Sequence, residues 1–344
     1  MVQTVQLHRI AERLMTILAL LMLHLASSSD KVRLSQHELF TADPEQFSPA
    51  AQLFERLDPP DLKDLHLPVV DSSFSAPGKK KKDTYAIIVS YNGLFFPGGY
   101  HPNPSITVPT VRGTLGREVE RLLESDVSLS TAGRTDAGVS AKAVLFSFKT
   151  YQDIDSIEAF LGKLNDACTP QGMTIHSVEL VDKSFHATFS TKSREYIYVL
   201  PVHRSFQSGA QVARAVQNQL DQVVGEELDF FGMSKGKIET IDSLCTLQTA
   251  TCCWFDGSMA ASENLPFTFA EVWPTVTTPE FPGCLVFRFK ANRFLKRMVR
   301  KMINSVLQEA TLPKGCWRDR IMAKERGDNH PAPGEGLCFW RAYV

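Results

Sequence analysis

The chain has 344 residues, of which 43% are apolar and 22% are charged, so it can bury a substantial core and about two domains are expected. Its formal net charge of −1 excludes a protein that binds nucleic acid through overall positive charge, so any such surface must be local. The cysteine number, seven, is odd and no Cys-x-x-Cys pair occurs, which argues against a disulfide framework and a structural zinc site. We expect reduced thiols in an intracellular compartment.

The N-terminus has the pattern of a targeting sequence. An apolar stretch over residues 14–26 follows a basic start and precedes three serines. This arrangement is typical of a mitochondrial or plastid presequence, or of a secretory signal. The alternative is an ordinary N-terminal amphipathic helix. No run approaches the ~20 apolar residues of a membrane span, so no membrane association is expected.

Residues 30–82 are rich in proline and end in a run of four lysines, residues 79–82. This composition predicts a poorly ordered extension, so residues 1–83 are interpreted as a targeting segment followed by that extension. The lysine run is typical of a solvated linker end; a nuclear import signal or a phosphate contact is the alternative. The compartment stays open between a mitochondrion or plastid, which the N-terminus favours, and the cytoplasm or nucleus.

From Tyr85 onward, strand patterns alternate with helix patterns. Strands are predicted over residues 85–91, 127–131, 143–149, 173–181, 187–202, 246–255, 266–272, 284–291 and 337–344. Helices are predicted over residues 111–123, 155–167, 211–224, 293–310 and 316–326. The strand at 143–149 alternates as a half-buried strand does, and no internal sequence repeat is visible. Mixed strands and helices with several adjacent strands indicate an α+β fold, its sheets covered on one face by helices.

A glycine-flanked segment, AGRTDAGVSA over residues 132–141, lies between two predicted strands. Glycines permit tight turns that present polar side chains at a sheet edge, and here Gly133 and Gly138 flank Arg134 and Asp136. An acid beside an arginine can be held ionised and oriented. On spacing alone, however, the favoured interpretation is a surface loop with a local ion pair.

Two tyrosines share one face of the predicted strand that follows the segment FHATFS, residues 185–190. Tyr196 and Tyr198 point to one side of that strand and their apolar neighbours to the other. A tyrosine on a strand that faces a cleft can stack on a base. The alternative is that both are amphipathic sheet residues.

A strongly basic stretch spans the end of one predicted strand and the start of the next helix. Asn292 is a good helix N-cap, and the apolar residues beyond it form one stripe. Such a stretch attracts phosphates, and the alternative is a solvated helix face. Residues 288–301 contain no acid and seven basic residues: Arg288, Lys290, Arg293, Lys296, Arg297, Arg300 and Lys301.

These three segments resemble, in the same order, the signatures of the TruA family of tRNA pseudouridine synthases. The first is similar to the family's Gly-Arg-Thr-Asp-x-Gly-Val loop, and the second to its Phe-His-Ala-x-Phe-Ser…Arg-x-Tyr-x-Tyr block. The third is similar to its Ala-Asn-x-Phe…Met-Val-Arg block. Shorter matches follow the family order and extend the resemblance over about residues 84–344: Tyr91-Asn92-Gly93, residues 110–115, residues 225–230 and Gly336-Leu337.

The resemblance implies an α+β fold of two ferredoxin-like (RRM-like) halves, residues 84–183 and 184–344. Their sheets would join across a central basic cleft, with helices on the outer face. It implies Asp136 as the catalytic nucleophile and Arg300 as the residue that pairs with it. Tyr196 would stack on the target uracil, and Arg134 would help to displace that base from its stack.

The implied reaction is the isomerisation of uridine to pseudouridine in the anticodon arm of tRNA, among tRNA positions 38 to 40. The reaction is neither redox nor group transfer, so no metal and no small-molecule cofactor is expected. The partner is tRNA, and a homodimer is one of the open arrangements. Residues 96–103 and 1–83 depart from the family pattern, whereas Ser140 resembles the branch that modifies the stem just after the anticodon.

Other functions compete with this one. The chain could be an RNA-binding or ribosome-assembly factor that kept the fold and lost catalysis, or an isomerase that acts on other RNAs. The presence of Asp136, Tyr196 and Arg300 together favours the enzyme, because a catalytically inactive relative has no chemical need for all three. An acid–base hydrolase built on Asp136 is disfavoured, because a second carboxylate or a metal-ligand cluster is missing from the motifs.

Overall fold

The computed structural model describes residues 39–41, 43–70, 82–99, 109–206, 208–235, 242–256, 268–312, 315–324 and 330–344. The predicted targeting pattern at residues 14–26 and most of the lysine run lie outside these residues. None of the helices in the described parts is long and apolar enough to cross a membrane.

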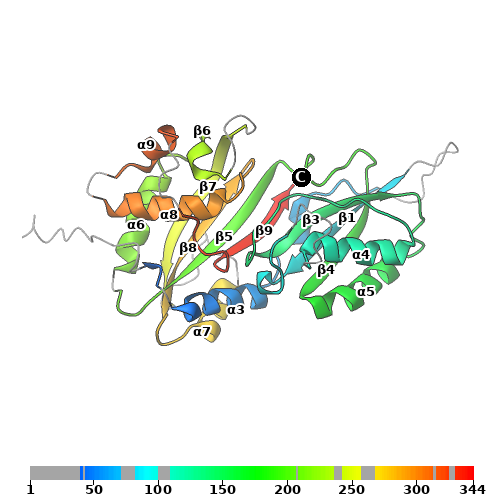
Figure 1. The fold of residues 1–344 in the computed structure, drawn as a ribbon, viewed down its shortest axis with the longest axis horizontal. Coiled ribbons are helices and arrows are strands. Elements are labelled where there is room, and N and C mark those ends of the chain that lie inside the picture. The colour runs from blue at the N-terminus through cyan, green and yellow to red at the C-terminus, as the bar shows by residue number, and fades with distance from the viewer. Residues whose placement is uncertain are drawn as a thin grey trace, which may run out of the picture.

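One nine-stranded sheet runs through the molecule, with the strand order β4-β1-β3-β9-β5-β8-β7-β6, and β2 paired to β3 (Figure 1). The mixed α+β class predicted from the sequence is therefore confirmed. The strands are β1 (Asp83–Tyr91), β2 (Ser130–Thr131), β3 (Ser140–Thr150), β4 (Met173–Val181), β5 (Ser193–Val202), β6 (Glu227–Asp229), β7 (Leu244–Phe255), β8 (Gly283–Ala291) and β9 (Leu337–Tyr343).

Seven α-helices accompany the sheet in the described residues. Most of them are amphipathic, as the predicted spacing requires, and bury an apolar stripe against the strands. The helices are α3 (Ser48–Arg56), α4 (Val111–Leu123), α5 (Ile157–Cys168), α6 (Gly209–Leu220), α7 (Phe269–Val276), α8 (Met298–Thr311) and α9 (Trp317–Met322).

The two halves of the chain repeat the same order of elements. The first runs β1-α4-β2-β3-α5-β4 and the second, leaving out the short β6, α7 and α9, runs β5-α6-β7-β8-α8-β9. Within each half, the third strand in this order lies beside the first, and all neighbours are antiparallel. The repeat is thus one of topology, although the sequence shows no internal similarity.

A short parallel ladder joins the halves. Ser140, Ala141 and Ala143 of β3 pair with Cys338, Phe339 and Arg341 of β9, respectively. The far end of β3 pairs with β2 instead. The start of β3 therefore lies at the seam between the halves, directly after the segment that the sequence singled out.

Helices cover both faces of the second half. Tyr196 and Tyr198 face one core, which includes residues of α6 and α8, whereas Ile197 and Val199 face a separate core with α3 and α7. Figure 1 shows α6 and α8 on one side of strands β5 and β8, and α3 and α7 on the other. The predicted alternation of this strand is confirmed, but both of its faces are buried, unlike the expected cover on one face only.

The N-terminal segment, residues 43–70, is not the poorly ordered extension that was predicted. Its helix α3 packs on the face of the sheet opposite α6 and α8, which we call the back of the sheet. Leu53 and Phe54 of α3 are buried against the core that contains Ile197 and Val199, because the helix turns its apolar stripe toward β5. Further along, Val69 forms a β-bridge with Val181 of β4. For this part of residues 30–82 the prediction from composition is wrong, because the segment also contains apolar residues that are buried against the sheet.

The N-terminal segment also explains why β3 is not half-buried as predicted. Residues 140–148 of β3 are all buried. On this strand, Lys142 is only 7% exposed, and its Nζ donates to the carbonyl oxygen of Glu55 at 3.3 Å. A segment that the sequence pattern treated as a tail therefore covers the second face of the strand.

Several predicted boundaries are wrong, and three of them concern elements of the cores or near the site. Residues 269–272, expected in a strand, begin α7, because Phe269, Trp273 and Val276 are buried at helical spacing. Residues 187–192, expected in β5, form turns before Ser193. Helix α8 begins at Met298 and not at residue 293, so Asn292 is not its N-cap.

Candidate active site

The loop over residues 132–139 is held in place by the last residue of β1 and the residues that follow it. The hydroxyl groups of Tyr91 and Thr135 lie 2.7 Å apart and are buried, and the Gly99 amide donates to the Thr135 carbonyl oxygen at 3.0 Å. The Ser140 hydroxyl accepts from the Gly93 amide at 3.0 Å. These bonds flank Asp136 on both sides, so its backbone is fixed relative to β1.

Close backbone packing supports the same loop. A side chain at Gly93 has no room, because an added Cβ would lie 2.4 Å from the carbonyl carbon of Val139. Gly138 adopts φ of 77°, a left-handed conformation that glycine accepts without steric cost. The glycines that suggested a tight turn in the sequence thus do produce one.

Asp136 forms an ion pair with Arg300 across the seam between the halves. Arg300 Nη1 lies 3.0 Å from Asp136 Oδ2, and Arg300 Nε donates to the carbonyl oxygen of Ala332 at 2.5 Å. The Asp136 side chain is 23% exposed and that of Arg300 is 15% exposed. The carboxylate is therefore oriented by a partly buried guanidinium that is itself anchored, yet solvent or a ligand can still reach it.

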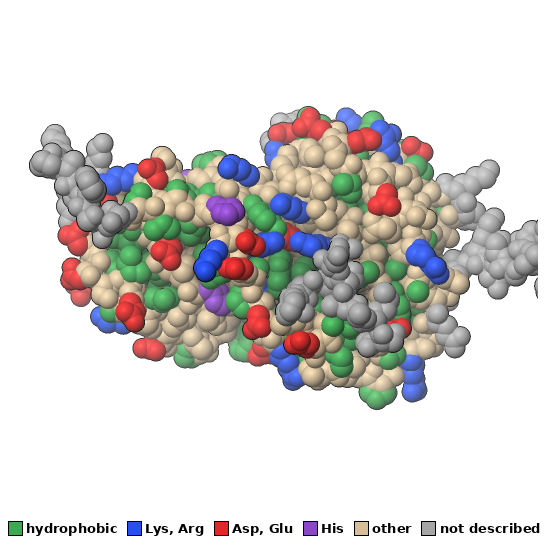
Figure 2. Space-filling view, turned by 180° about the vertical axis from the view of Figure 1, so that it is seen from behind, with side chains coloured by type: hydrophobic (Ala, Val, Ile, Leu, Met, Phe, Trp, Pro, Cys, Tyr) green, Lys and Arg blue, Asp and Glu red, His purple; other side chains and the backbone are tan. Residues whose placement is uncertain are grey.

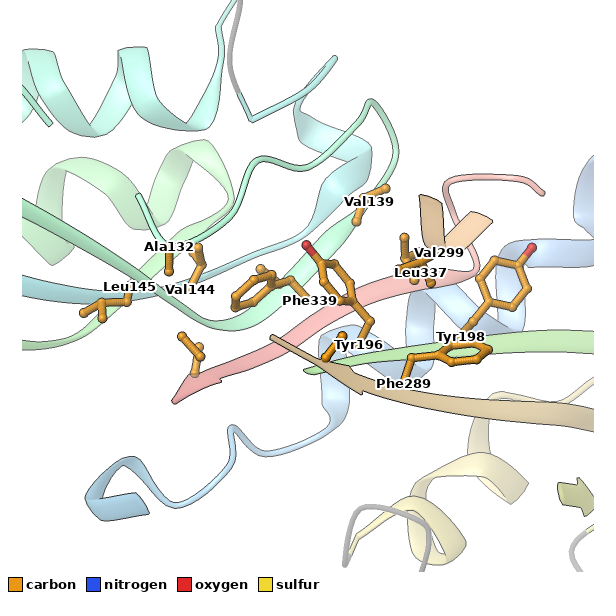
Figure 3. Close-up of a cluster of buried hydrophobic side chains, with 14 of the residues drawn as sticks. Ala132, Val139, Val144, Leu145, Tyr196, Tyr198, Phe289, Val299, Leu337 and Phe339 are labelled. Carbon is orange, nitrogen blue, oxygen red and sulfur yellow. The ribbon is translucent and has the colours of Figure 1, made fainter. Parts of the chain in front are cut away.

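Tyr196 lies beside this pair in an aromatic cluster. Its ring contacts Phe294 and Phe339 edge to face, with centroid distances of 5.1 and 5.0 Å. Figure 3 shows the ring of Tyr196 next to Phe339, with its hydroxyl directed toward the loop that carries Val139. A Cβ added at Gly133 would lie 3.4 Å from that hydroxyl, so the tyrosine reaches the Asp136 loop.

The phenol of Tyr196 is a hydrogen-bonding group and not a base at neutral pH. Burial raises the pKa of Tyr196, against a smaller lowering by Arg194, and the negative charge of Asp136 adds to the rise. The ring is 7% exposed. It can therefore present a protonated hydroxyl and a small part of its aromatic surface to a ligand at Asp136.

Arg134 is placed differently from the other three candidate residues. It lies two positions before Asp136, and its side chain is exposed. The structure thus brings Asp136, Tyr196 and Arg300 together and leaves Arg134 at the surface of the loop. An exposed cation next to a partly buried ion pair is placed to meet an approaching polyanion before the inner residues do.

The segment FHATFS, residues 185–190, is a tight turn that packs on the strand leading into the Asp136 loop. The Thr188 hydroxyl donates to the Thr131 carbonyl oxygen at 2.8 Å, and Arg194 donates to the carbonyl oxygens of Ala132 and Asn292 at 2.9 and 2.8 Å. Arg194 therefore ties the loop to the end of β8. The turn leaves the ring of Phe189 83% exposed.

The basic stretch over residues 288–301 is less free than the sequence indicates. Arg288 pairs with Glu195, Arg293 pairs with Asp242 at 2.7 Å, and Arg300 pairs with Asp136. Lys290 lies 3.6 Å from the ring centroid of Tyr343. The acids are distant in the sequence, so a window without acidic residues is a poor guide to charge that is free to bind phosphate.

The surface view agrees with this mixture of charge. On the face shown in Figure 2, basic and acidic side chains lie interspersed near the middle of the molecule. Among the described residues, no group of three or more His, Cys, Asp and Glu side chains is arranged to hold a metal ion. The candidate residues Asp136, Arg134, Arg300 and Tyr196 offer one carboxylate, two guanidinium groups and one phenol.

Sequence reasoning missed several residues of this site. Arg297 Nε lies 4.0 Å from Asp136 Oδ2, which makes it a second cation at the carboxylate. Phe294 and Phe339 enclose Tyr196, and Thr135 anchors the loop. The basic stretch contains Arg297 but does not distinguish it from six other cations. Its place directly before α8, which the predicted helix boundary obscured, helps to distinguish it.

Comparison of the sequence with known proteins finds relatives that share one name. No family model matches the chain. The tRNA pseudouridine synthase A of Leptospira biflexa serovar Patoc is 30% identical over 278 residues, which cover 75% of this chain and 93% of that protein. The proteins of the same name from Chlorobaculum tepidum and Chlorobium limicola are 28% and 29% identical, and the match covers 98% and 96% of their lengths.

Proposed function

The chain belongs to the tRNA pseudouridine synthase A (TruA) family, and from this premise we propose that it isomerises uridine to pseudouridine in tRNA, with Asp136 as the catalytic nucleophile. The relatives bear the name of this activity. The observation that carries the proposal is the ion pair of 3.0 Å between Asp136 and Arg300, beside Tyr196 and at the seam of the two halves.

The reaction needs a carboxylate in this setting. The N1–C1′ bond of uridine breaks, the uracil turns, and a C5–C1′ bond forms while C5 loses a proton and N1 gains one. A carboxylate starts this sequence either by attack on the ribose or ring or by support of elimination toward a glycal. Both routes require an oriented carboxylate in contact with the nucleoside, which the anchored Asp136 provides.

Each neighbouring residue has a role in the proposal. The target uridine must leave its stack, at a cost of a few kcal/mol that pocket contacts offset. Arg134, exposed on the loop, occupies the space from which the base is displaced. The uracil then packs against the ring edge of Tyr196, and Arg300 holds the carboxylate toward the ribose.

The architecture is consistent with these roles. We propose that residues 84–183 and 184–344 are two ferredoxin-like halves, because each follows a β-α-β-β-α-β order with antiparallel neighbours. The RNA would lie across their seam, where Asp136 of the first half meets Arg300 and Tyr196 of the second. We further propose that the substrate is the anticodon arm of tRNA, in line with Ser140, which directly follows the loop as the first residue of β3.

A tritium-release experiment tests the proposal. A tRNA transcript labelled at C5 of uridine should release tritium to water with the wild-type protein, because C5 loses its hydrogen. Asp136→Asn should reduce release to background and bind tRNA with an affinity within about threefold of wild type. Asp166→Asn, the same exchange at an exposed position of α5, is the matched control and should release tritium normally.

The outcomes separate the competing functions. Normal release by Asp136→Asn would show that another group is the nucleophile. Tight tRNA binding by the wild-type protein with no release would favour an RNA-binding factor that has lost catalysis. Release from other RNAs but not from tRNA would identify a different substrate class for the same chemistry.

A further inference from the structure

Arg297 has a backbone conformation that its position in the fold does not explain. Its φ of 63° and ψ of 7° are left-handed. The described residues contain three other non-glycine residues with positive φ, namely His66, Glu124 and Lys324, and all of them lie at the C-terminal end of a helix. Such ends commonly carry a left-handed residue, whereas Arg297 directly precedes a helix.

The turn that contains Arg297 favours a different residue type. The Met298 amide donates to the Leu295 carbonyl oxygen at 3.0 Å, which closes a four-residue turn with Arg297 in its third position. Glycine and asparagine are preferred at a third position with positive φ. An arginine there is held against its conformational preference, and residues under such strain cluster at functional sites.

The Nε of Arg297 also lacks a hydrogen-bond partner. This atom is buried, and the nearest acidic oxygen, Asp136 Oδ2, is 4.0 Å away. The same oxygen already accepts from Arg300 at 3.0 Å. A buried donor without an acceptor is unfavourable. The side chain as a whole is 36% exposed, so an incoming ligand can reach the guanidinium at atoms other than Nε.

The charge at this point favours an anion. Two guanidinium groups, those of Arg297 and Arg300, face a single carboxylate, that of Asp136. The other arginines of the basic stretch, Arg288 and Arg293, have acidic partners of their own. Arg297 is therefore the arginine of this stretch with a donor still available at the site, and a planar guanidinium matches the oxygens of a phosphate.

We propose that Arg297 binds a backbone phosphate of the substrate RNA beside the displaced uridine, and that its left-handed conformation is retained to hold its guanidinium toward that phosphate. The inference rests on the proposed function for the identity of the RNA. A phosphate next to the target ribose must approach Asp136 when the nucleoside enters, and Arg297 supplies the donor and the positive charge that meet it. Arg300, by contrast, stays with the carboxylate.

The test exploits the backbone conformation. Arg297→Asn removes the guanidinium but suits the left-handed turn, so the melting temperature should stay equal or rise. Binding to an unmodified tRNA transcript should weaken by about tenfold. The slope of log Kd against log salt concentration should decrease by about 1, which corresponds to the loss of one phosphate contact. Arg297→Lys should keep the salt slope and recover only part of the affinity, since it retains the charge and lacks the planar guanidinium.

A matched control is available elsewhere in the chain. Lys324→Asn makes a comparable exchange at another left-handed residue, one that pairs with Asp229 at 2.8 Å, and should change neither affinity nor salt slope. A drop in melting temperature for Arg297→Asn, or unchanged binding with slower turnover, would overturn the proposal. The first result would indicate a structural role and the second a role in orienting Asp136 alone.

The binding measurement does not depend on catalysis. A wild-type protein that binds tRNA without turnover would contradict the proposed function, and the Arg297 contact could still be measured through its salt slope. A wild-type protein that turns over normally, together with an Arg297→Asn variant whose affinity and slope match it, would contradict the phosphate contact alone.

Discussion

Asp136 and Arg300 are separated by 164 residues in the chain, and their side chains meet at 3.0 Å between the two halves of the sheet. Arg300 is held on its other side by the carbonyl oxygen of Ala332. Arg300→Lys retains the charge but loses the planar fork that makes both bonds at once. We expect turnover to fall by about 100-fold, as for loss of one positioned charge contact, and tRNA affinity to change little.

Single-turnover rates and tRNA binding curves measure the two effects separately. The control is Arg320→Lys, which makes the same exchange in a pair with Glu309 at 2.8 Å, a contact between α9 and α8. Equal losses of turnover in the two variants would mean that the effect at Arg300 reflects general destabilisation.

Gly93→Ala should displace the Asp136 loop. The added Cβ would lie 2.4 Å from Val139 and 2.5 Å from the Gly138 carbonyl oxygen, and backbone atoms cannot yield as a flexible side chain can. We expect lower thermal stability and a large loss of turnover. Gly162→Ala in α5 is the matched control, since nothing lies within 4 Å of its added Cβ. That variant should gain roughly 0.5–1 kcal/mol of stability with normal turnover.

Glu195→Gln should destabilise the fold in a pH-dependent way. Burial alone would raise the pKa of Glu195, but the hydrogen bond from Tyr343 and the charges of Arg288 and Arg341 outweigh it, so the pKa lies below its usual value. A depressed carboxyl pKa contributes stability that is present above the unfolded pKa and is lost as the pH falls through the folded pKa. At neutral pH the variant should lose about 3 kcal/mol, because two guanidinium groups lose their buried partner.

Urea unfolding at several pH values checks this expectation. The difference in unfolding free energy between wild type and Glu195→Gln should be constant from neutral pH down to the unfolded pKa of about 4.5. It should then close as the pH falls further through the lower pKa of the folded state. Glu226→Gln, at an exposed pair with Arg318, should differ from wild type by less than about 1 kcal/mol throughout. A gap that persists unchanged in acid would contradict the assigned charge network.

Leu53→Ala tests whether the N-terminal segment is part of the folded core. Leu53 is fully buried against the back of the sheet, so its truncation should cost about 2–5 kcal/mol of unfolding free energy. Glu55→Ala, an exposed position on the same helix, should stay within about 0.5 kcal/mol of wild type. Equilibrium urea unfolding compares them, and a neutral Leu53→Ala would show that the segment contributes little to the core.

Much of the fold could be predicted from periodicity, because its core elements bury regular apolar stripes. The helix at Val111–Leu123 and the strand at Met173–Val181 have the predicted bounds. The prediction failed at residues 269–272, where a short helix with an internal proline, Pro274, resembled an apolar strand. It failed again at α3, because composition gave no indication that this helix packs against a face of β5, which is distant in the sequence.

The site divides in the same way. Asp136, Tyr196 and Arg300 were indicated by resemblance of motifs, and no spacing rule relates residues that come from separate halves. Arg297 could not be singled out, because its distinction is a left-handed backbone and an unpaired Nε. Asn292 was expected to begin α8 but its Oδ1 instead accepts from the Thr246 amide at 3.0 Å, a tertiary contact that local capping rules do not anticipate.

The position of β9 has a consequence for the order of assembly. This strand lies between β3 and β5 in the sheet, although it follows every other strand in the chain. Domains generally fold in the order of their synthesis on the ribosome, so each half-sheet can form early while the central place stays vacant. Contacts between the two halves through β9 are then among the last to form, and a nascent chain halted before residue 337 should lack catalytic competence however well its earlier strands have folded.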